Sequence, residues 1–154
     1  MEQERQGFWR TGVGKLKIGV AYYPEHWKPE RWPVDARLMS QANTAYCRLA
    51  EFTWCRLEPE EGRYDFSWLD RAIEILYEQG IRVVLCTPTA CPPAWLIQKH
   101  PEILPVNRER LRLSFGSRRH YCLTSQVYRE HSISIVKAMA AHYATNPAVA
   151  GWRS

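Results

Sequence analysis

Residues 67–86 constrain the fold more than any other part of the chain. Ser67 followed by Asp70 is typical of a helix N-terminal capping box, and Gly80 stands where a helix C-cap belongs. Apolar residues between them recur at the spacing of one helix face: Leu69, Ile73, Leu76 and Tyr77. Residues 81–86 follow at once and are almost entirely apolar, which is typical of a strand covered on both faces in a parallel sheet. The segment therefore predicts an α/β fold.

The same alternation of strands and helices extends along the chain. We expect its other elements at 16–21, 31–42, 45–49, 126–143 and 149–152. The apolar faces of the two helices among them comprise Val34, Leu38, Met39 and Ala42 in the first, and Ile135, Val136, Met139 and Tyr143, after an N-cap at Ser125, in the second. The order β-α-β-α-β-loop-α-β predicts a parallel sheet. This pattern alone leaves both an open doubly wound sheet and part of a TIM barrel possible, and the chain has no G-x-G-x-x-G or P-loop.

Residues 87–124 form a long connection with five prolines and one possible short helix at 94–99. Loops of this length are uncommon in compact domains unless they carry function or are disordered. Aromatic residues and prolines recur along the connection, which argues against disorder. We therefore expect this connection to contribute to a functional site.

Composition excludes several classes of function. The 154 residues are 45% hydrophobic and carry a net charge of +5, as in an ordinary soluble domain. The excess of positive charge is local, in Arg108, Arg110, Arg112, Arg118 and Arg119, and no nucleic-acid-binding motif accompanies it, so no nucleic-acid partner is expected. No stretch reaches the roughly 18 apolar residues of a membrane span, and residues 1–14 lack the apolar core of a signal peptide.

The five cysteines are odd in number and contain no C-x-x-C pair: Cys47, Cys55, Cys86, Cys91 and Cys122. This pattern favours a reduced, cytoplasmic chain whose cysteines are small buried hydrophobic residues.

Polar and aromatic side chains gather where the expected strands end. In parallel α/β folds the chemistry lies at this edge of the sheet. The residues concerned are 22–27 after the first strand; Arg48, Glu51, Phe52 and Trp54 around the end of the second; Thr87, Thr89, Cys91 and Trp95 after the third; and 118–122 in the long connection. Aromatic faces suit the apolar faces of sugars, and guanidinium and carboxylate groups suit their hydroxyls. We therefore expect a sugar-binding site at this edge.

Each of these residues also has a structural interpretation. The seven tryptophans could form a core, and Glu51 could be an ion-pair partner of Arg48. Arg118 and Arg119 could lie on a solvated loop, and His26 and His120 are expected to be packing residues. The run of carboxylates at 58–61 contains Pro59 and precedes Gly62, so a turn is favoured there over a catalytic pair.

Five segments, in order, resemble glycoside hydrolase family 42. They are 19–27 (GVAYYPEHW), 48–54 (RLAEFTW), 56–66 (RLEPEEGRYDF), 87–95 (TPTACPPAW) and 118–122 (RRHYC). The resemblance runs from about Lys15 to Trp152 and implies a retaining β-galactosidase that acts on β-galactosides. It implies that residues 15–154 are the N-terminal half of a (β/α)8 TIM barrel, strands 1 to 4, after an N-terminal extension at 1–14.

The resemblance also assigns residues. Arg48, Glu51 and Arg118 match positions that line the galactose subsite, and Cys122 matches one ligand of a structural four-cysteine zinc site found in some relatives. Because a zinc site needs about four ligands, we expect no zinc and no other cofactor on this chain alone. For complete members the resemblance implies homotrimers.

The chain departs from the family pattern at residues 151–154 (GWRS), where members continue into an Asn-Glu pair whose Glu is the catalytic acid/base. No residue of the chain matches that Glu or the nucleophile, so we expect no catalytic residues here and no turnover by the chain alone. The alternative is a non-catalytic sugar-binding or assembly half-barrel.

Overall fold

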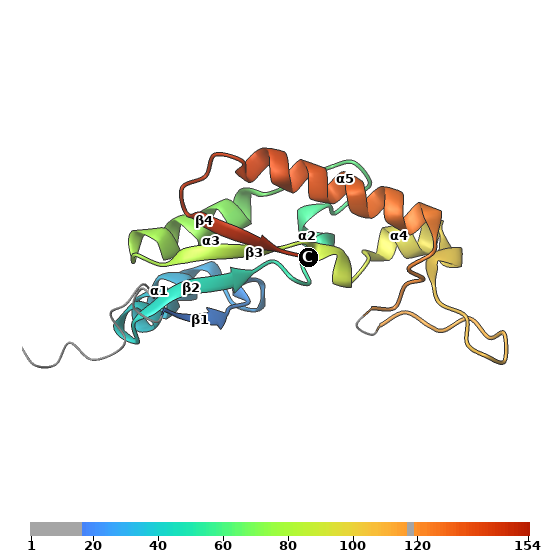
Figure 1. The fold of residues 1–154 in the computed structure, drawn as a ribbon, viewed down its shortest axis with the longest axis horizontal. Coiled ribbons are helices and arrows are strands. Elements are labelled where there is room, and N and C mark those ends of the chain that lie inside the picture. Colours follow the sequence, from blue (N-terminus) through green and yellow to red (C-terminus); the bar gives the residue numbers. More distant parts are fainter. Residues whose placement is uncertain (1–16, 117–118) are drawn as a thin grey trace, which may run out of the picture.

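The computed structural model describes residues 17–116 and 119–154; the expected extension at 1–14 lies outside this range. Four parallel strands form one sheet in the order β1-β2-β3-β4 (Figure 1). They are β1 (Ile18–Ala21), β2 (Thr44–Leu49), β3 (Arg82–Cys86) and β4 (Val149–Arg153). The main helices are α1 (Trp32–Gln41), α3 (Ser67–Glu78) and α5 (Gln126–Tyr143), with short helices α2 (Trp54–Leu57) and α4 (Ala94–Lys99). The predicted α/β fold is confirmed. Strands that follow one another in the sequence also lie next to one another in the sheet.

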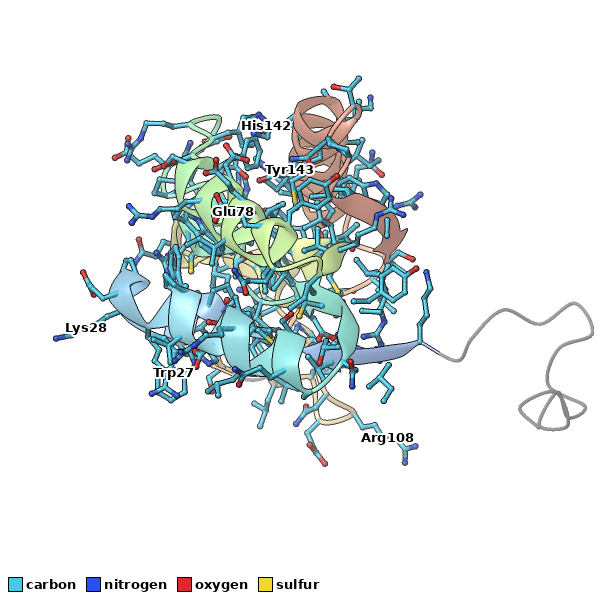
Figure 2. The ribbon with its side chains drawn as sticks, turned by 90° about the vertical axis from the view of Figure 1, so that its left-hand side faces the viewer. Trp27, Lys28, Glu78, Arg108, His142 and Tyr143 are labelled. Carbon is cyan, nitrogen blue, oxygen red and sulfur yellow. The ribbon has the colours of Figure 1, made fainter. Side chains whose placement is uncertain are left out.

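One face of the sheet carries the core. In β2 and β3 the side chains alternate, so that Cys47, Leu49, Val83 and Leu85 are buried while Arg48 and Val84 of the other face are only partly covered. Helices α1, α3 and α5 lie side by side over the buried face (Figure 2). Their contributions to the same core are Ala36 from α1, Leu69, Ile73 and Leu76 from α3, and Ile135, Met139 and Tyr143 from α5.

Helix α1 buries a different face from the one expected. Trp32 and Ala36 are its buried residues, whereas Val34 and Leu38 are 39% and 49% exposed. The indole of Trp32 donates a hydrogen bond to the carbonyl of Pro24 (2.9 Å), which turns this side of the helix inward. The prediction was wrong for Val34, Leu38 and Ala42, which are exposed, because it left Trp32 out of account. Met39 packs against the core as expected.

Helix α3 begins one residue earlier than a Ser67 cap requires. Its first turn is capped by Asp65, whose Oδ1 accepts hydrogen bonds from the Ser67 backbone N–H (3.0 Å) and hydroxyl (2.6 Å). Asp70 forms no capping box but meets His142 of α5 at 2.9 Å. At the other end Gly80 has φ +77°, and the Ile81 N–H bonds to the Leu76 carbonyl, so the predicted glycine C-cap is confirmed.

Helix α5 agrees with prediction: Ser125 Oγ accepts from the Tyr128 N–H, and Ile135, Met139 and Tyr143 are buried. The connection between β3 and α5 contains α4 and the 3-10 turns η4 (Pro88–Ala90) and η5 (Pro101–Ile103), and it extends past the carboxyl ends of the strands (Figure 1). Two more 3-10 turns, η2 (Pro24–His26) and η3 (Pro29–Arg31), follow β1. Among the described residues, no helix has the length and apolar character needed to span a membrane.

Candidate functional site

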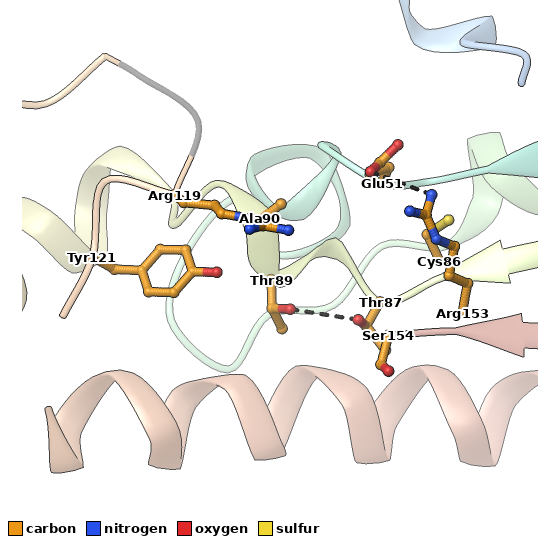
Figure 3. A pocket seen from close by; sticks show the side chains of 9 residues that line it. All are labelled: Glu51, Cys86, Thr87, Thr89, Ala90, Arg119, Tyr121, Arg153 and Ser154. Carbon is orange, nitrogen blue, oxygen red and sulfur yellow. Dashed lines mark hydrogen bonds and ion pairs between the residues drawn. The ribbon is translucent and has the colours of Figure 1, made fainter. Parts of the chain in front are cut away.

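A small polar cavity of about 100 Å³ lies at the carboxyl ends of β2, β3 and β4. Figure 3 shows its walls, which come from the residues following each of these strands and from the long connection. The lining residues are Glu51, Cys86, Thr87, Thr89, Ala90, Arg119, Tyr121, Arg153 and Ser154. The strand-end rule therefore located the edge of the sheet at which the polar groups converge.

Glu51 is the best-buried charged group of this cavity, with a side chain only 11% exposed. Its Oε2 pairs with Nη2 of Arg48 at 2.9 Å, and its Oε1 lies 3.7 Å from Nη1 of Arg153. The same Arg48 nitrogen donates to the hydroxyl of Tyr23 (3.4 Å). Two guanidinium groups thus orient a nearly buried carboxylate at the cavity, where it can accept hydrogen bonds from hydroxyls.

The backbone directly before Glu51 has a strained conformation. Ala50, directly before it, is fully buried and has φ +72°, a conformation that L-residues rarely adopt. The Thr53 hydroxyl donates to the Ala50 carbonyl (3.1 Å), and the Tyr22 N–H to the Arg48 carbonyl (3.0 Å), which hold the chain in this turn. Strain held by surrounding structure at the end of a strand is typical of functional sites.

Threonine and tyrosine side chains form the opposite wall. Thr87 Oγ1 and Thr89 Oγ1 are 3.4 Å apart, and the Tyr128 hydroxyl donates to the Thr89 carbonyl (2.8 Å). Tyr121 stacks on Tyr128 with ring centroids 4.1 Å apart, and in Figure 3 its hydroxyl is directed towards Thr89. This wall offers hydroxyls beside an aromatic ring, which is a suitable surface for a sugar.

The predicted arginine of the long connection cannot be placed, because Arg118 lies outside the described residues. Its neighbour Arg119 lines the cavity and has a backbone φ of +57°. The backbone N–H of Arg119 donates a hydrogen bond to the Ala90 carbonyl (3.1 Å). Arg153 was not selected from the sequence. The strand-end rule could have selected it, because Arg153 is the last residue of β4 and Arg48 lies near the end of β2.

Two of the aromatic residues expected at the sugar-binding site belong to the core or pack against it. Trp54 is fully buried, and its indole donates to Oε2 of Glu58 (2.7 Å). The indole of Trp95 donates to the Glu58 carbonyl (2.8 Å). Glu58 itself is 2% exposed and also accepts from the Gly62 N–H (2.8 Å), so the run at 58–61 is a turn, as expected, with one buried structural carboxylate.

The loop after β1 contains a second unusual carboxyl group. Both carboxyl oxygens of Glu25 are buried from solvent. Burial raises the pKa of Glu25 above its ordinary value, partly offset by its own backbone hydrogen bond and by His26 and Arg56. His120 is buried against Phe115, which fits its expected packing role, whereas His26 is exposed and stacks on Tyr23.

The cysteines are all free thiols, but their burial differs from expectation. Cys47 and Cys86 are buried, whereas Cys55 is exposed and Cys91 and Cys122 are intermediate. A hydrogen bond with Thr124 lowers the pKa of Cys122, which makes it the most suitable metal ligand of the five. In residues 17–116 and 119–154, however, no group of three His, Cys, Asp or Glu side chains could hold a metal ion, so the donors present do not form a zinc site.

The family model for β-galactosidase, glycoside hydrolase family 42, matches residues 21–154. The chain belongs to this family. It is 53% identical over 137 residues to the β-galactosidase of Thermus thermophilus, a match that covers 89% of this chain and 21% of that protein. A β-galactosidase of Clostridium cellulovorans is 49% identical over 138 residues. The chain thus spans about a fifth of the length of these relatives.

Solved structures of family 42 agree with the fold. The β-galactosidase of the Antarctic haloarchaeon Halorubrum lacusprofundi is similar with a TM-score of 0.85 and 47% identity over 89% of this chain and 20% of that chain. The cold-adapted enzyme of Rahnella sp. R3 reaches a TM-score of 0.87 at 39% identity, over 93% and 21%. These relatives are TIM-barrel enzymes, so the four parallel strands are an N-terminal part of such a barrel.

Proposed function

We propose that this chain provides the galactose-binding part of a retaining β-galactosidase, with Arg48, Glu51 and Arg118 as sugar-binding residues. The observation that carries the proposal is the position of Glu51, between Arg48 and Arg153 at the carboxyl edge of the sheet. An oriented carboxylate and guanidinium groups beside tyrosine and threonine hydroxyls suit the ring hydroxyls of a β-galactoside. Membership of family 42 supports the same substrate class.

We further propose that the chain alone does not hydrolyse β-galactosides. A retaining mechanism uses two carboxyl groups about 5 Å apart. Glu51 is the one carboxylate among the described residues that line the cavity, and both of its oxygens face arginines. Such a group can accept hydrogen bonds from sugar hydroxyls, whereas a retaining mechanism needs a second carboxyl group beside it.

The test is hydrolysis of nitrophenyl β-galactoside by the purified chain, with buffer as the reference. The proposal predicts no release of nitrophenol above the buffer rate. Turnover above that rate, abolished by Glu51→Gln, would show that Glu51 is catalytic and would contradict the proposal.

The open sheet favours a second candidate, an assembly half-barrel that pairs with further strands. In the part of the chain that the structure describes, β1 pairs with β2 alone and β4 with β3 alone. Ile18, Val20 and Trp152 on these edge strands are exposed. Unpaired edges with apolar side chains favour association with another polypeptide. A concentration-dependent dimer in analytical ultracentrifugation would support this candidate, and a monomer up to high concentration would exclude self-assembly.

The free cysteines support a cytoplasmic location as part of this proposal. All five are thiols in the structure, and burial raises the pKa of Cys47 to about 12, which keeps that thiol unreactive. A domain with five thiols and no disulfide suits a reducing compartment.

A further inference from the structure

One buried tyrosine of α5 contacts two of the segments that form the wall of the polar cavity. Tyr128 is 5% exposed and is not itself one of the lining residues. Its hydroxyl donates to the Thr89 carbonyl in η4 (2.8 Å), and its ring stacks on Tyr121 of the long connection, with the two ring planes at 15°. Figure 3 shows Thr89 and Tyr121 on the side of the cavity nearest α5. Tyr128 therefore links α5 to both segments.

The bond to the Thr89 carbonyl fixes the backbone of η4, a turn of only three residues. A carbonyl that loses its buried partner is costly, so this bond favours one position of the turn. Two hydroxyls of the cavity wall depend on that position, because Thr87 Oγ1 and Thr89 Oγ1 are 3.4 Å apart on either side of Pro88. The next carbonyl, that of Ala90, accepts the Arg119 N–H (3.1 Å). The position of η4 is thus passed on to the segment that carries Arg119 and Tyr121.

Tyr128 is itself held firmly. Its backbone N–H donates to Ser125 Oγ (3.3 Å) at the start of α5, and its ring lies against the fully buried Trp54, with centroids 6.3 Å apart. Burial raises the pKa of Tyr128 above its ordinary value, so the hydroxyl keeps its proton and remains a donor. A side chain fixed by a helix cap and by the core can hold the groups around a site in place.

We infer that Tyr128 is a positioning residue of the sugar site, which acts through Thr89 and Tyr121 without touching the sugar. This inference rests on the proposed function and adds to it a residue from the helix behind the cavity wall. If Tyr128 served the core alone, removing its hydroxyl would lower stability without a selective effect on sugar binding.

The test is titration calorimetry of galactose with Tyr128→Phe, which keeps the stacked ring and removes the hydroxyl. We expect binding at least about fivefold weaker than in the parent, the factor that corresponds to the loss of about one hydrogen bond. Tyr143→Phe is the matched control, because Tyr143 is also a buried tyrosine of α5 but lies outside the cavity lining, about 22 Å further along the helix. It should leave galactose affinity within about twofold of the parent, even if it costs as much stability in urea.

Two further readouts separate positioning from a structural role. Thr89→Ala removes the wall hydroxyl but keeps the carbonyl that Tyr128 binds, so Tyr128→Phe should weaken galactose binding less in that background than in the parent. A purely structural loss would reduce affinity by the same factor in both. Without any sugar, Tyr128→Phe should also speed hydrogen exchange of the Arg119 N–H, and leave the Ile81 N–H, bonded to the Leu76 carbonyl, unchanged.

The results that would overturn the inference differ from the one that would overturn the proposed function. If the parent binds galactose and Tyr128→Phe binds it equally well, Tyr128 is not a positioning residue, while the galactose site stands. Equal weakening by Tyr128→Phe and Tyr143→Phe, or the same loss with and without the Thr89 hydroxyl, also contradicts the inference alone. If the parent chain does not bind galactose, the proposed function fails and the inference fails with it.

Discussion

Glu58 is expected to hold together the turn that leads from α2 to α3. Its buried carboxylate accepts hydrogen bonds from the Trp54 indole (2.7 Å) and the Gly62 N–H (2.8 Å). Glu58→Ala leaves the indole nitrogen of a fully buried tryptophan without this acceptor, at a cost of about 1–3 kcal/mol, and removes a second charge-assisted bond at a partly buried site. We expect a loss of about 3 kcal/mol in the free energy of unfolding, a large share of the roughly 5–15 kcal/mol of an ordinary domain.

Urea unfolding followed by tryptophan fluorescence measures this loss. Glu58→Gln keeps one carbonyl acceptor and should lose about half as much. Glu60→Ala is the matched control: among the described residues Glu60 pairs with the exposed Arg63, and its loss should change stability by less than about 0.5 kcal/mol. A loss below about 1 kcal/mol for Glu58→Ala would refute the reasoning, because the buried indole would then have found another acceptor.

Three further predictions concern pH, strain and capping. Burial raises the folded-state pKa of Glu25, so its contribution to stability is complete below the unfolded pKa of about 4.3 and is lost as the pH rises through the folded value. Glu25→Gln should therefore gain stability relative to the parent as the pH rises above about 4.3 in thermal melts, while Glu30→Gln, which is exposed, should not. Ala50→Val puts a branched side chain at φ +72° in a fully buried position and should cost more than about 2 kcal/mol in urea; a neutral result would mean that the turn relaxes. Ser125→Ala should cost about 1 kcal/mol through the lost cap of α5, and an unchanged urea midpoint would contradict the capping bond to Tyr128.

Local patterns predicted most of the fold because helix faces, caps and buried strands are largely short-range features. Gly80 and Ser125 act as their sequence context indicates. The errors arose where a distant partner decided the outcome. Asp70 contacts His142 of α5 instead of capping its own helix, and a bond to the Pro24 carbonyl orients α1 through Trp32.

The candidate site was predictable as a region but not as a set of contacts. The strand-end rule selected Arg48 and Glu51, and the structure brings them within 2.9 Å of each other. The ion pair that the sequence also allowed is present in the structure. Arg153 joins them because β2 and β4 end at the same edge, and the strand-end rule applied to the last residue of β4 would have selected it.

Galactose binding by this chain tests the central claim most directly. Titration calorimetry of the purified chain with galactose should show saturable binding, and Glu51→Gln, with folding checked by circular dichroism, should weaken it at least about tenfold through the loss of a charged hydrogen-bond acceptor. Binding unaffected by Glu51→Gln, or no binding to the folded parent chain, would contradict the assignment of this cavity as the galactose site.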